Sequence, residues 1–383
     1  MRWWLCIVGI VLAAVTACST QERGASPTSP VDSTSKALAG QLTVPAGFQV
    51  GYFARDLPGV RFMAPGADGA VYASEPAAGK VVRVWDVNGD GVADSVATAV
   101  SDLDRPHGLA FHGGYLYIAN TGSIVRVRLG ADGRATDAPE MLARISGGGG
   151  HWTRTIVFGP DSMMYVSIGS TCNLCVETDS ERASVMRFDA DGKHGQRFAF
   201  GLRNAVGMAV NPVTNDIWVS QNERDNLPPD HQNLPPEEIN ILHSGGDYGW
   251  PYCYSESGRA VPNPEYNDAA RCAPTIPAAL EMQAHSAPLG MAFLAGATEF
   301  PAEYRGDLLV AFHGSWDRDV PTGAKVVRVR VANGLPASYE DFVAGWQRAD
   351  GSRWGRPVDV MVYRDGSVLV SDDLANAIYR VWH

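Results

Sequence analysis

Six short apolar stretches of this 383-residue chain begin just after a basic side chain, so the same chemistry recurs at one position of a repeat. Arginine makes paired hydrogen bonds with carboxylates, and the imidazole of histidine titrates near neutral pH. A ring of such groups could bind a small ligand with several carboxylates, and a histidine among them could remove a proton from a substrate. The residues at this position are Arg61, His107, His151 with Arg154, Arg203, His285 and Arg356.

His151 is the best general-base candidate of this set, because it is a histidine that follows the glycine-rich run 147–150. A structural hydrogen bond within that loop is the alternative role for it. For the set as a whole, the alternative is a coincidental register of scattered surface residues. Six basic side chains at one repeat position favour an anion site.

The stretches that follow these residues predict β-strands. In "LAFHGGYLYIAN" (109–120) and "VMVYRDGSVLVSD" (360–372), two apolar runs flank a turn rich in Gly, Asp or Asn. Their spacing is close to that of four-stranded propeller blades. We predict an all-β fold over residues 42–383: a six-bladed β-propeller with four-stranded antiparallel blades and long loops on the active-site face. The isolated strand 47–54 should complete the last blade, and the polar interval 222–284 should supply functional loops.

The N-terminus predicts export. Residues 1–17 have a basic start and an apolar stretch (3–15) too short for a comfortable membrane span. They end in a lipobox-like run before Cys18, which would carry the lipid; an ordinary cleaved signal peptide is the alternative. Residues 18–41 are rich in Ser, Thr, Pro and Gly and predict a flexible tether. We therefore expect a lipid-anchored protein of the cell envelope, facing the periplasm or the cell exterior.

The cysteines after Cys18 are even in number, and export favours disulfides. Proximity in sequence predicts the pairs Cys172–Cys175 and Cys253–Cys272. A four-cysteine zinc site and a redox-active CxxC remain alternatives, whereas a c-type haem would need a histidine at Val176. The formal net charge of -11 argues against nucleic acid as a partner.

A second candidate metal site is the run "DVNGDGVAD" (86–94). Asp86, Asn88, Asp90 and Asp94 have the spacing that starts a calcium loop. The bidentate acid of an EF-hand is missing, because Ala97 takes its place. A tight hairpin turn rich in Asp, Asn and Gly explains the run equally well.

Several longer motifs resemble those of a known family. They are "GGGGHWTRTIVFGPDSMMYVSIGSTCNLC", "FGLRNAVGMAVNP", "PPEEINILHSGGDYGWPYCY", "AFHGSWDR" and "WGRPVDVMVYRDGSVLVSDD". The chain resembles the quinoprotein sugar dehydrogenases, in the sorbosone dehydrogenase-like branch of the soluble glucose and aldose sugar dehydrogenases. This resemblance implies a propeller that binds pyrroloquinoline quinone (PQQ) and calcium. It also implies oxidation of the anomeric carbon of an aldose or a sorbosone-like aldehyde sugar by hydride transfer to the quinone.

The resemblance also implies roles for individual residues. His151 matches the base that removes the proton from the sugar C1 hydroxyl. Arg203 and Asn204 match cofactor contacts, and Arg203 could stabilise charge that develops on a quinone oxygen. Arg356 matches an arginine that pairs with a cofactor carboxylate. His107 joins the predicted cofactor contacts through its place among the repeated basic positions.

The chain departs from the glucose-oxidising members at several positions. Gly150 stands where an acid is expected, and Val358 stands where a second arginine is expected. The expected fifth-blade lysine has no clean match, and His313, Trp316 or Arg318 are the candidates to replace it. These differences leave the identity of the sugar open.

The expected calcium ligands differ as well. The glucose-oxidising members use backbone carbonyls of a Gly-Pro pair, where this chain has Asn222 and Glu223, so a side-chain carboxylate would contribute. The expected electron acceptor is a cytochrome or a membrane quinone. Two other functions remain as alternatives: a calcium-dependent sugar lactonase, and a non-catalytic propeller that binds carbohydrate or protein.

Overall fold

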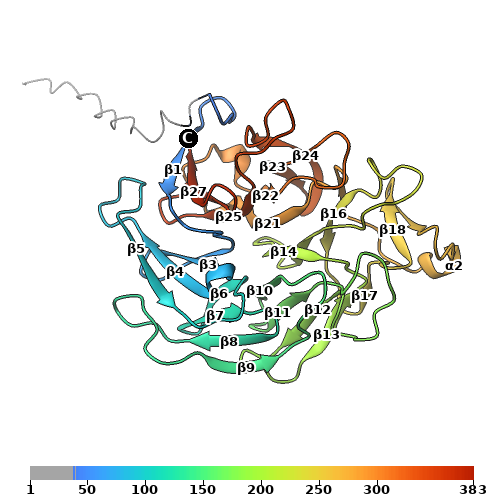
Figure 1. Cartoon of the computed structure of the whole chain (residues 1–383), viewed down its shortest axis with the longest axis horizontal. Coiled ribbons are helices and arrows are strands. Elements are labelled where there is room, and N and C mark those ends of the chain that lie inside the picture. The colour runs from blue at the N-terminus through green and yellow to red at the C-terminus, as the bar shows by residue number, and fades with distance from the viewer. Residues whose placement is uncertain (1–37, 39) are drawn as a thin grey trace, which may run out of the picture. The chain divides into compact units, whose positions relative to one another are not determined.

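The computed structural model describes Leu38 and residues 40–383, and its regular structure is almost entirely β-strand (Figure 1). The predicted signal peptide, Cys18 and most of the tether lie outside the described residues. Leu38 is fully buried in the same apolar cluster as Leu42 and Trp346, so ordered packing begins before residue 42. No helix within the described residues combines the length and the apolar character needed to cross a membrane.

Six sheets follow one another along the described residues and form the four-stranded antiparallel blades of a propeller; the third sheet also carries a short fifth strand, which pairs in parallel. Alternating Val, Ile, Leu and Tyr side chains favour these strands. The first three blades are β2 (Met63–Pro65), β3 (Val71–Glu75), β4 (Lys80–Trp85) and β5 (Ser95–Val100); β6 (Leu109–His112), β7 (Tyr115–Ala119), β8 (Ser123–Val127) and β9 (Glu140–Arg144); and β10 (Arg154–Phe158), β11 (Met164–Ile168), β12 (Ser184–Phe188) and β13 (Gln196–Phe200).

The remaining blades repeat this order, and the sixth takes its outer strand from the N-terminal end of the described chain. They are β14 (Ala205–Val210), β15 (Ile217–Gln221), β16 (Glu237–Ile241) and β20 (Leu280–Met282); β21 (Pro288–Phe293), β22 (Leu308–Phe312), β23 (Lys325–Ala332) and β24 (Leu335–Val343); and β25 (Pro357–Val362), β26 (Val368–Asp372), β27 (Ala377–Trp382) and β1 (Gln49–Ala54). The predicted six-bladed propeller is therefore confirmed.

The ring closes through β1. This strand pairs antiparallel with β27, with Gln49 opposite Trp382, as the sequence predicted for the isolated N-terminal strand. The inner strands β2, β6, β10, β14, β21 and β25 contact one another in this order, and β25 contacts β2 again. Residues that precede these inner strands are therefore brought to one end of the central channel.

Apolar side chains fill the space between neighbouring blades, with one buried cluster at each of the six junctions. Phe53 and Leu369 of the sixth blade, for example, pack with Val71 of the first. Because successive strand residues point to opposite faces, a blade between two others buries both faces. This is why β11 and β22 are buried at every position.

The polar interval 222–284 forms a set of loops and short elements, as expected from its composition. It contains β17 (Gly246–Asp247), which pairs in parallel with β13, the hairpin of β18 (Cys253–Glu256) and β19 (Arg259–Pro262), and the helix α2 (Ala269–Cys272). Short 3-10 helices occur elsewhere: η1 (Pro76–Ala78), η2 (Leu294–Gly296) and η3 (Ala302–Tyr304).

Both predicted disulfides are present: Cys172–Cys175 and Cys253–Cys272. The second one joins β18 to α2 across 19 residues, and both of its cysteines are buried. The zinc-site alternative is therefore not supported for these four cysteines.

Replacing Cys253 and Cys272 together with serine should lower the free energy of unfolding by about 3 kcal/mol, because the unfolded chain regains the entropy that a loop of this size loses on closure. Denaturant unfolding of the two proteins checks this value. The Cys172→Ser, Cys175→Ser pair is the matched control and should have a smaller effect on stability, since its loop is much shorter. Equal unfolding midpoints for wild type and the Cys253/Cys272 variant would contradict the prediction.

Candidate active site

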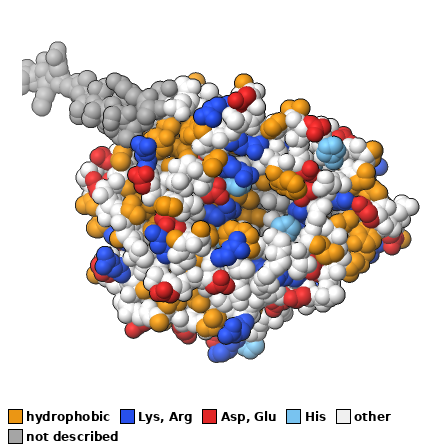
Figure 2. Space-filling view, viewed as in Figure 1, with side chains coloured by type: hydrophobic (Ala, Val, Ile, Leu, Met, Phe, Trp, Pro, Cys, Tyr) orange, Lys and Arg blue, Asp and Glu red, His pale blue; other side chains and the backbone are white. Residues whose placement is uncertain are grey.

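A cavity of about 220 Å³ lies at the end of the channel where the inner strands begin. Its wall includes residues that stand within two positions of the start of five of the six inner strands: Arg61, Thr153, Arg203, Ala287 and Arg356. Figure 2 shows Lys, Arg and His side chains gathered around a hollow near the centre of this face. Three arginines and three histidines of this net acidic protein thus line one cavity.

Most of the predicted site residues meet in this cavity, although their sequence positions span more than 200 residues. The predicted residues in its wall are His151, Arg203, Asn204, Asn222, Glu223, His313, Trp316 and Arg356. The shared position before each inner strand explains this convergence, and the wall also holds Arg61 and His285 of the repeated basic set.

Two predicted cofactor contacts lie elsewhere. The imidazole of His107 is fully buried between Phe62 and Trp152, and it binds the carbonyl oxygen of Arg154. The guanidinium of Arg318 donates to backbone carbonyl oxygens, among them that of Val320 at 3.0 Å. In the structure His107 thus packs against aromatic rings and Arg318 holds a loop, and their contact with a cofactor remains a prediction from the sequence.

An apolar cluster closes the channel next to the cavity. Val206 and Leu289 line the cavity and pack with Phe62 and Val358, and Phe62 also lines a second cavity on the other side of the cluster. Val358 stands where the family resemblance suggested a second arginine, and here it is fully buried. The cluster keeps water from one side of the cationic groups, which strengthens their electrostatic effect.

His151 is held in a single tautomer. Its Nδ1 lies 3.0 Å from the carbonyl oxygen of Ser170 and 2.9 Å from Ser170 Oγ, whose own proton is donated to the Cys172 carbonyl oxygen at 2.7 Å. Since both Ser170 oxygens accept, Nδ1 must carry the proton, and Nε2 presents a lone pair. Burial, followed by the positive charge of Arg203, lowers the pKa of His151 to about 3. The imidazole is therefore a neutral proton acceptor at neutral pH.

Arg203 is buried and fixed from several directions. Its Nε donates to the Asn173 carbonyl oxygen at 3.0 Å, and its Nη2 donates to Asn173 Oδ1 at 2.9 Å. Nη2 also forms an ion pair with Asp225 at 3.1 Å, while Nη1 donates to the carbonyl oxygen of Asn222. The guanidinium is thus oriented at the cavity wall before any ligand binds.

Asp373 connects Arg61 and His313, two residues of the cavity wall. It pairs with Arg61 and accepts a hydrogen bond from His313 Nε2 at 2.9 Å. Burial opposes ionisation of Asp373, but the hydrogen bond from His313 and the charges of Arg61 and Arg356 outweigh it and lower the pKa of Asp373 to about 2. Arg356 itself donates to the carbonyl oxygens of His313 and Gly314.

The Asp373→Asn variant should lack the part of the free energy of unfolding that depends on the ionisation of Asp373. The folded pKa of Asp373 lies below its ordinary value of 3.8, so its contribution is present above that value and disappears as the pH falls towards 2. We expect wild type to be more stable than the variant by about 2 kcal/mol near neutral pH, with the difference shrinking between about pH 4 and about pH 2. Unfolding free energies of both proteins over this range test it. A constant difference would show that the ionisation of Asp373 is not involved.

Acidic side chains form the wall beside Arg203. Glu223, Asp225 and Glu237 line the cavity, and Glu238 is buried behind them. Burial raises the pKa of Glu237 to about 8, and burial together with the charge of Glu223 raises that of Glu238 to about 8. These carboxylates would become ionised more readily next to an added cation.

Sequence reasoning missed Asp225, Glu237 and Asp373. Asp225 and Glu237 lie in the polar interval that was expected to supply functional loops, and Glu237 also lies in one of the family motifs. Asp225, His285 and Asp317 each bring one potential ligand atom within 4.8 Å of the others. His285 Nδ1 faces Asp225 at 3.8 Å, and its Nε2 contacts the carbonyl oxygen of Leu234.

The loop 86–94 has the hydrogen bonds of a tight hairpin. Asp86 accepts from the backbone N–H of Gly89 and Gly91, and Asp94 accepts from those of Val87 and Asn88. The Asp86, Asn88, Asp90 and Asp94 side chains therefore cap their own turn, as the hairpin alternative suggests. Calcium at this loop remains a prediction from the sequence.

A family model described as TrAA12-like matches residues 42–383. The chain belongs to the TrAA12-like family. Among its curated relatives, a pyrroloquinoline quinone-dependent pyranose dehydrogenase of Coprinopsis cinerea is 27% identical over 335 residues, which cover 76% of this chain and 45% of the relative. An uncharacterized protein of Borreliella burgdorferi is 36% identical over 226 residues, 58% of each protein. This TrAA12-like chain thus spans about half the length of these curated relatives.

Solved structures share the fold. The calcium structure of a family AA12 protein from Trichoderma reesei has a TM-score of 0.79 at 23% identity, covering 89% of this chain and 96% of the other. The holo form of the PQQ domain of Coprinopsis cinerea pyranose dehydrogenase has a TM-score of 0.77 at 22% identity, covering 90% and 97%. The resemblance to quinoprotein sugar dehydrogenases that the motifs indicated is confirmed at the level of the family.

Proposed function

We propose that this TrAA12-like protein is a quinoprotein dehydrogenase that uses pyrroloquinoline quinone to oxidise the anomeric carbon of an aldose or a sorbosone-like aldehyde sugar. The observation that carries the proposal is the convergence of Arg61, Arg203 and Arg356 with His151 in one cavity. The names of the Coprinopsis relative and of its holo structure support it. When bound, the quinone would supply the two-electron acceptor.

The cavity suits a flat ligand with three carboxylates. Three arginines line it, and arginine donors bind carboxylates well. Arg203 already uses four of its five N–H groups within the protein, so it has one left for a ligand. Arg61 Nε is buried and has no hydrogen-bond partner among the described residues, so one donor is still available to a ligand. The apolar cluster with Val206 and Leu289 offers a dry surface beside these charges.

His151 would accept the proton of the sugar hydroxyl at Nε2. Ser170 keeps the proton on Nδ1, and the buried position next to Arg203 keeps the ring neutral. Arg203, with its fixed guanidinium, would hold the bound ring system and stabilise negative charge at its oxygen. Trp316 is 71% exposed at the cavity and offers an aromatic face on which a sugar ring could stack.

We also propose that calcium binds in this cavity. The carboxylates of Glu223, Asp225 and Glu237 are the hard oxygen donors that calcium prefers. Asn222 is less available, because its Nδ2 donates to Pro288 and its carbonyl oxygen accepts from Arg203. The calcium structure of the Trichoderma protein supports the proposal.

Reconstitution tests the proposed function. The purified protein is mixed with pyrroloquinoline quinone and calcium, and oxidation of a panel of aldoses is followed with an artificial electron acceptor. We expect turnover that requires the quinone and that falls when calcium is chelated. Hydrolysis of a sugar lactone with calcium alone, without quinone-dependent oxidation, would instead support the lactonase alternative. The acidic side chains in the cavity wall are the observation that favours this alternative.

Three further proposals come from the sequence alone. Residues 1–17 direct export, Cys18 carries a lipid that anchors the protein to a membrane of the cell envelope, and a cytochrome or a membrane quinone accepts the electrons. Loss of membrane association in a Cys18→Ser variant would support the anchor.

A further inference from the structure

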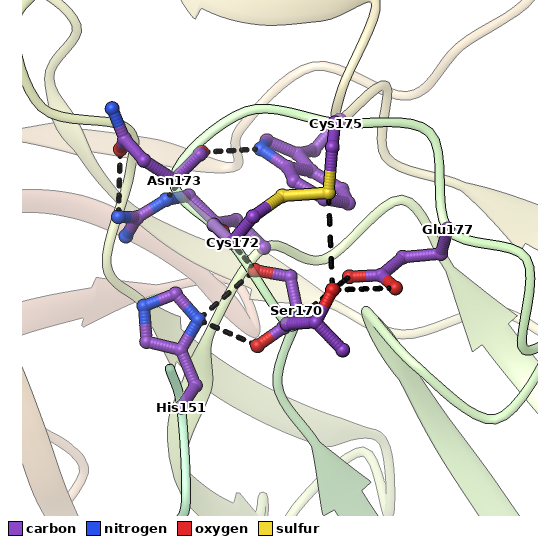
Figure 3. The surroundings of a disulfide bond; sticks show 9 residues. His151, Ser170, Cys172, Asn173, Cys175 and Glu177 are labelled. Carbon is purple, nitrogen blue, oxygen red and sulfur yellow. Dashed lines mark hydrogen bonds between the residues drawn. A yellow bond between two sulfur atoms is a disulfide. The ribbon is translucent and has the colours of Figure 1, made fainter. Parts of the chain in front are cut away.

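The segment closed by the Cys172–Cys175 disulfide contacts Arg203 directly and is linked to His151 through Ser170. The proposed function, on which this inference rests, places both residues at the centre of the chemistry. Figure 3 shows this segment next to His151 and Ser170. It lies between β11 and β12, where the cavity-side end of the third blade is built. Within the closed segment, Asn173 is held by several hydrogen bonds from its backbone and its side chain.

Asn173 uses its backbone and its side chain to hold Arg203. Its carbonyl oxygen accepts from Arg203 Nε and from Trp250 Nε1, at 3.0 and 3.3 Å. Its Oδ1 accepts from Arg203 Nη2 at 2.9 Å and from the backbone N–H of Asp225 at 2.8 Å. Its Nδ2 donates to the Asp225 carbonyl oxygen at 3.0 Å. The amide therefore connects the arginine and its ion-pair partner in a single geometry.

The residues just before the closed segment hold the histidine. Ser170 Oγ donates its proton to the carbonyl oxygen of Cys172, so it accepts from His151 Nδ1, as the Ser170 carbonyl oxygen does. Thr171, between these two residues, is fixed by hydrogen bonds from its hydroxyl to Glu177 at 3.0 Å. The orientation of His151 and that of Arg203 thus depend on the same few residues of backbone.

We propose that Asn173 is a positioning residue that holds the Arg203 guanidinium at the cavity wall, and that the Cys172–Cys175 disulfide serves the site by fixing the backbone of Asn173. Asn173 lies outside the cavity wall and acts through Arg203. A disulfide across only three residues adds little loop-closure stabilisation to the whole chain. Its main effect is therefore local order, at the place where two chemical groups need it.

The first test is a quinone titration of the purified protein and its Asn173→Ala variant. The variant loses one hydrogen bond to a charged group, so we expect binding about tenfold weaker than wild type. Val176→Ala is the matched control, because Val176 follows the same segment and its side chain is 53% exposed. The control should bind the quinone as wild type does. Thermal unfolding of all three proteins separates this effect from a loss of fold.

The second test needs no cofactor and distinguishes a positioning role from a structural one. Asn173→Asp puts a carboxylate against Arg203, and the charge of Arg203 is, after burial, the largest influence that lowers the pKa of His151. Arg154 and Arg182 also face His151 and are unchanged in this variant. We expect the pKa of His151, followed by NMR in the quinone-free protein, to rise in Asn173→Asp and to stay constant in Val176→Ala.

The third test asks whether the disulfide acts through Asn173. The Cys172→Ser, Cys175→Ser variant should weaken quinone binding, and adding Asn173→Ala to it should cause little further loss. Additive losses would overturn this part of the proposal. Wild-type affinity in Asn173→Ala together with an unchanged His151 pKa in Asn173→Asp would overturn all of it. If wild type itself fails to bind the quinone, the proposed function fails, and the His151 titration still decides whether Asn173 controls Arg203.

Discussion

Replacing His151 with alanine should leave quinone binding intact and abolish nearly all turnover. The imidazole is neutral, its Nδ1–H is held by Ser170, and its Nε2 lone pair has no competing proton at neutral pH. General-base groups of this kind contribute a factor of about 100 to about 10,000 in rate. We expect kcat to fall within that range, measured with an excess of quinone and with a saturating aldose.

The control for this variant is His194→Ala. His194 has a largely exposed side chain paired with Asp189, and it does not line the cavity. Its removal should change neither quinone affinity nor turnover. Turnover of His151→Ala within a few-fold of wild type, with the cofactor bound, would reject the role of His151 as the base.

Replacing Arg203 with alanine should impair binding and rate together. The variant loses a hydrogen-bond donor to a carboxylate or an oxygen of the quinone. Its affinity for the quinone should therefore fall by about tenfold to about hundredfold. A donor aimed at charge that develops in the transition state adds about hundredfold in kcat. Quinone titration and single-turnover kinetics of the variant measure the two effects separately.

Loss of Arg203 also leaves the partly buried Asp225 without its ion-pair partner, so a second variant is needed to separate the two effects. Arg203→Ala combined with Asp225→Asn removes the unpaired charge and should recover stability without recovering quinone affinity. Arg203→Lys keeps the charge but loses the fork of donors, and it should regain only part of the affinity. Normal binding and a normal rate in Arg203→Ala would contradict the proposed role.

The blades could be predicted from the sequence because their signals are local. Alternating apolar residues and Gly- or Asp-containing turns mark each strand pair, and the repeat position before each inner strand brought His151, Arg203 and Arg356 into one cavity. Both disulfides also followed from short sequence separations. A repeat fold turns a sequence register into a spatial ring, which is why site residues could be identified before their contacts were known.

Residues that act through distant partners could not be predicted in this way. Asp373 meets Arg61 across 312 positions, and Asn173 meets Asp225 across 52. These pairs depend on ring closure and on loop conformation, neither of which leaves a periodic signal. His107 is an example of a different kind, since it occupies the repeat position but packs against Phe62 and does not line the cavity. The repeat position determines where the backbone of a residue lies, whereas the packing of its neighbours determines the direction of its side chain.

The most direct test of the central claim, that Arg61, Arg203 and Arg356 form a site for a tricarboxylate, is a calorimetric titration. Pyrroloquinoline quinone is titrated into the cofactor-free protein with calcium present. We predict saturable binding of one quinone per chain that weakens in Arg356→Ala and in Arg203→Ala and is unaffected by Arg318→Ala, because Arg318 lies outside the cavity wall. Absence of saturable heat in wild type, or equal affinity in all four proteins, would contradict it.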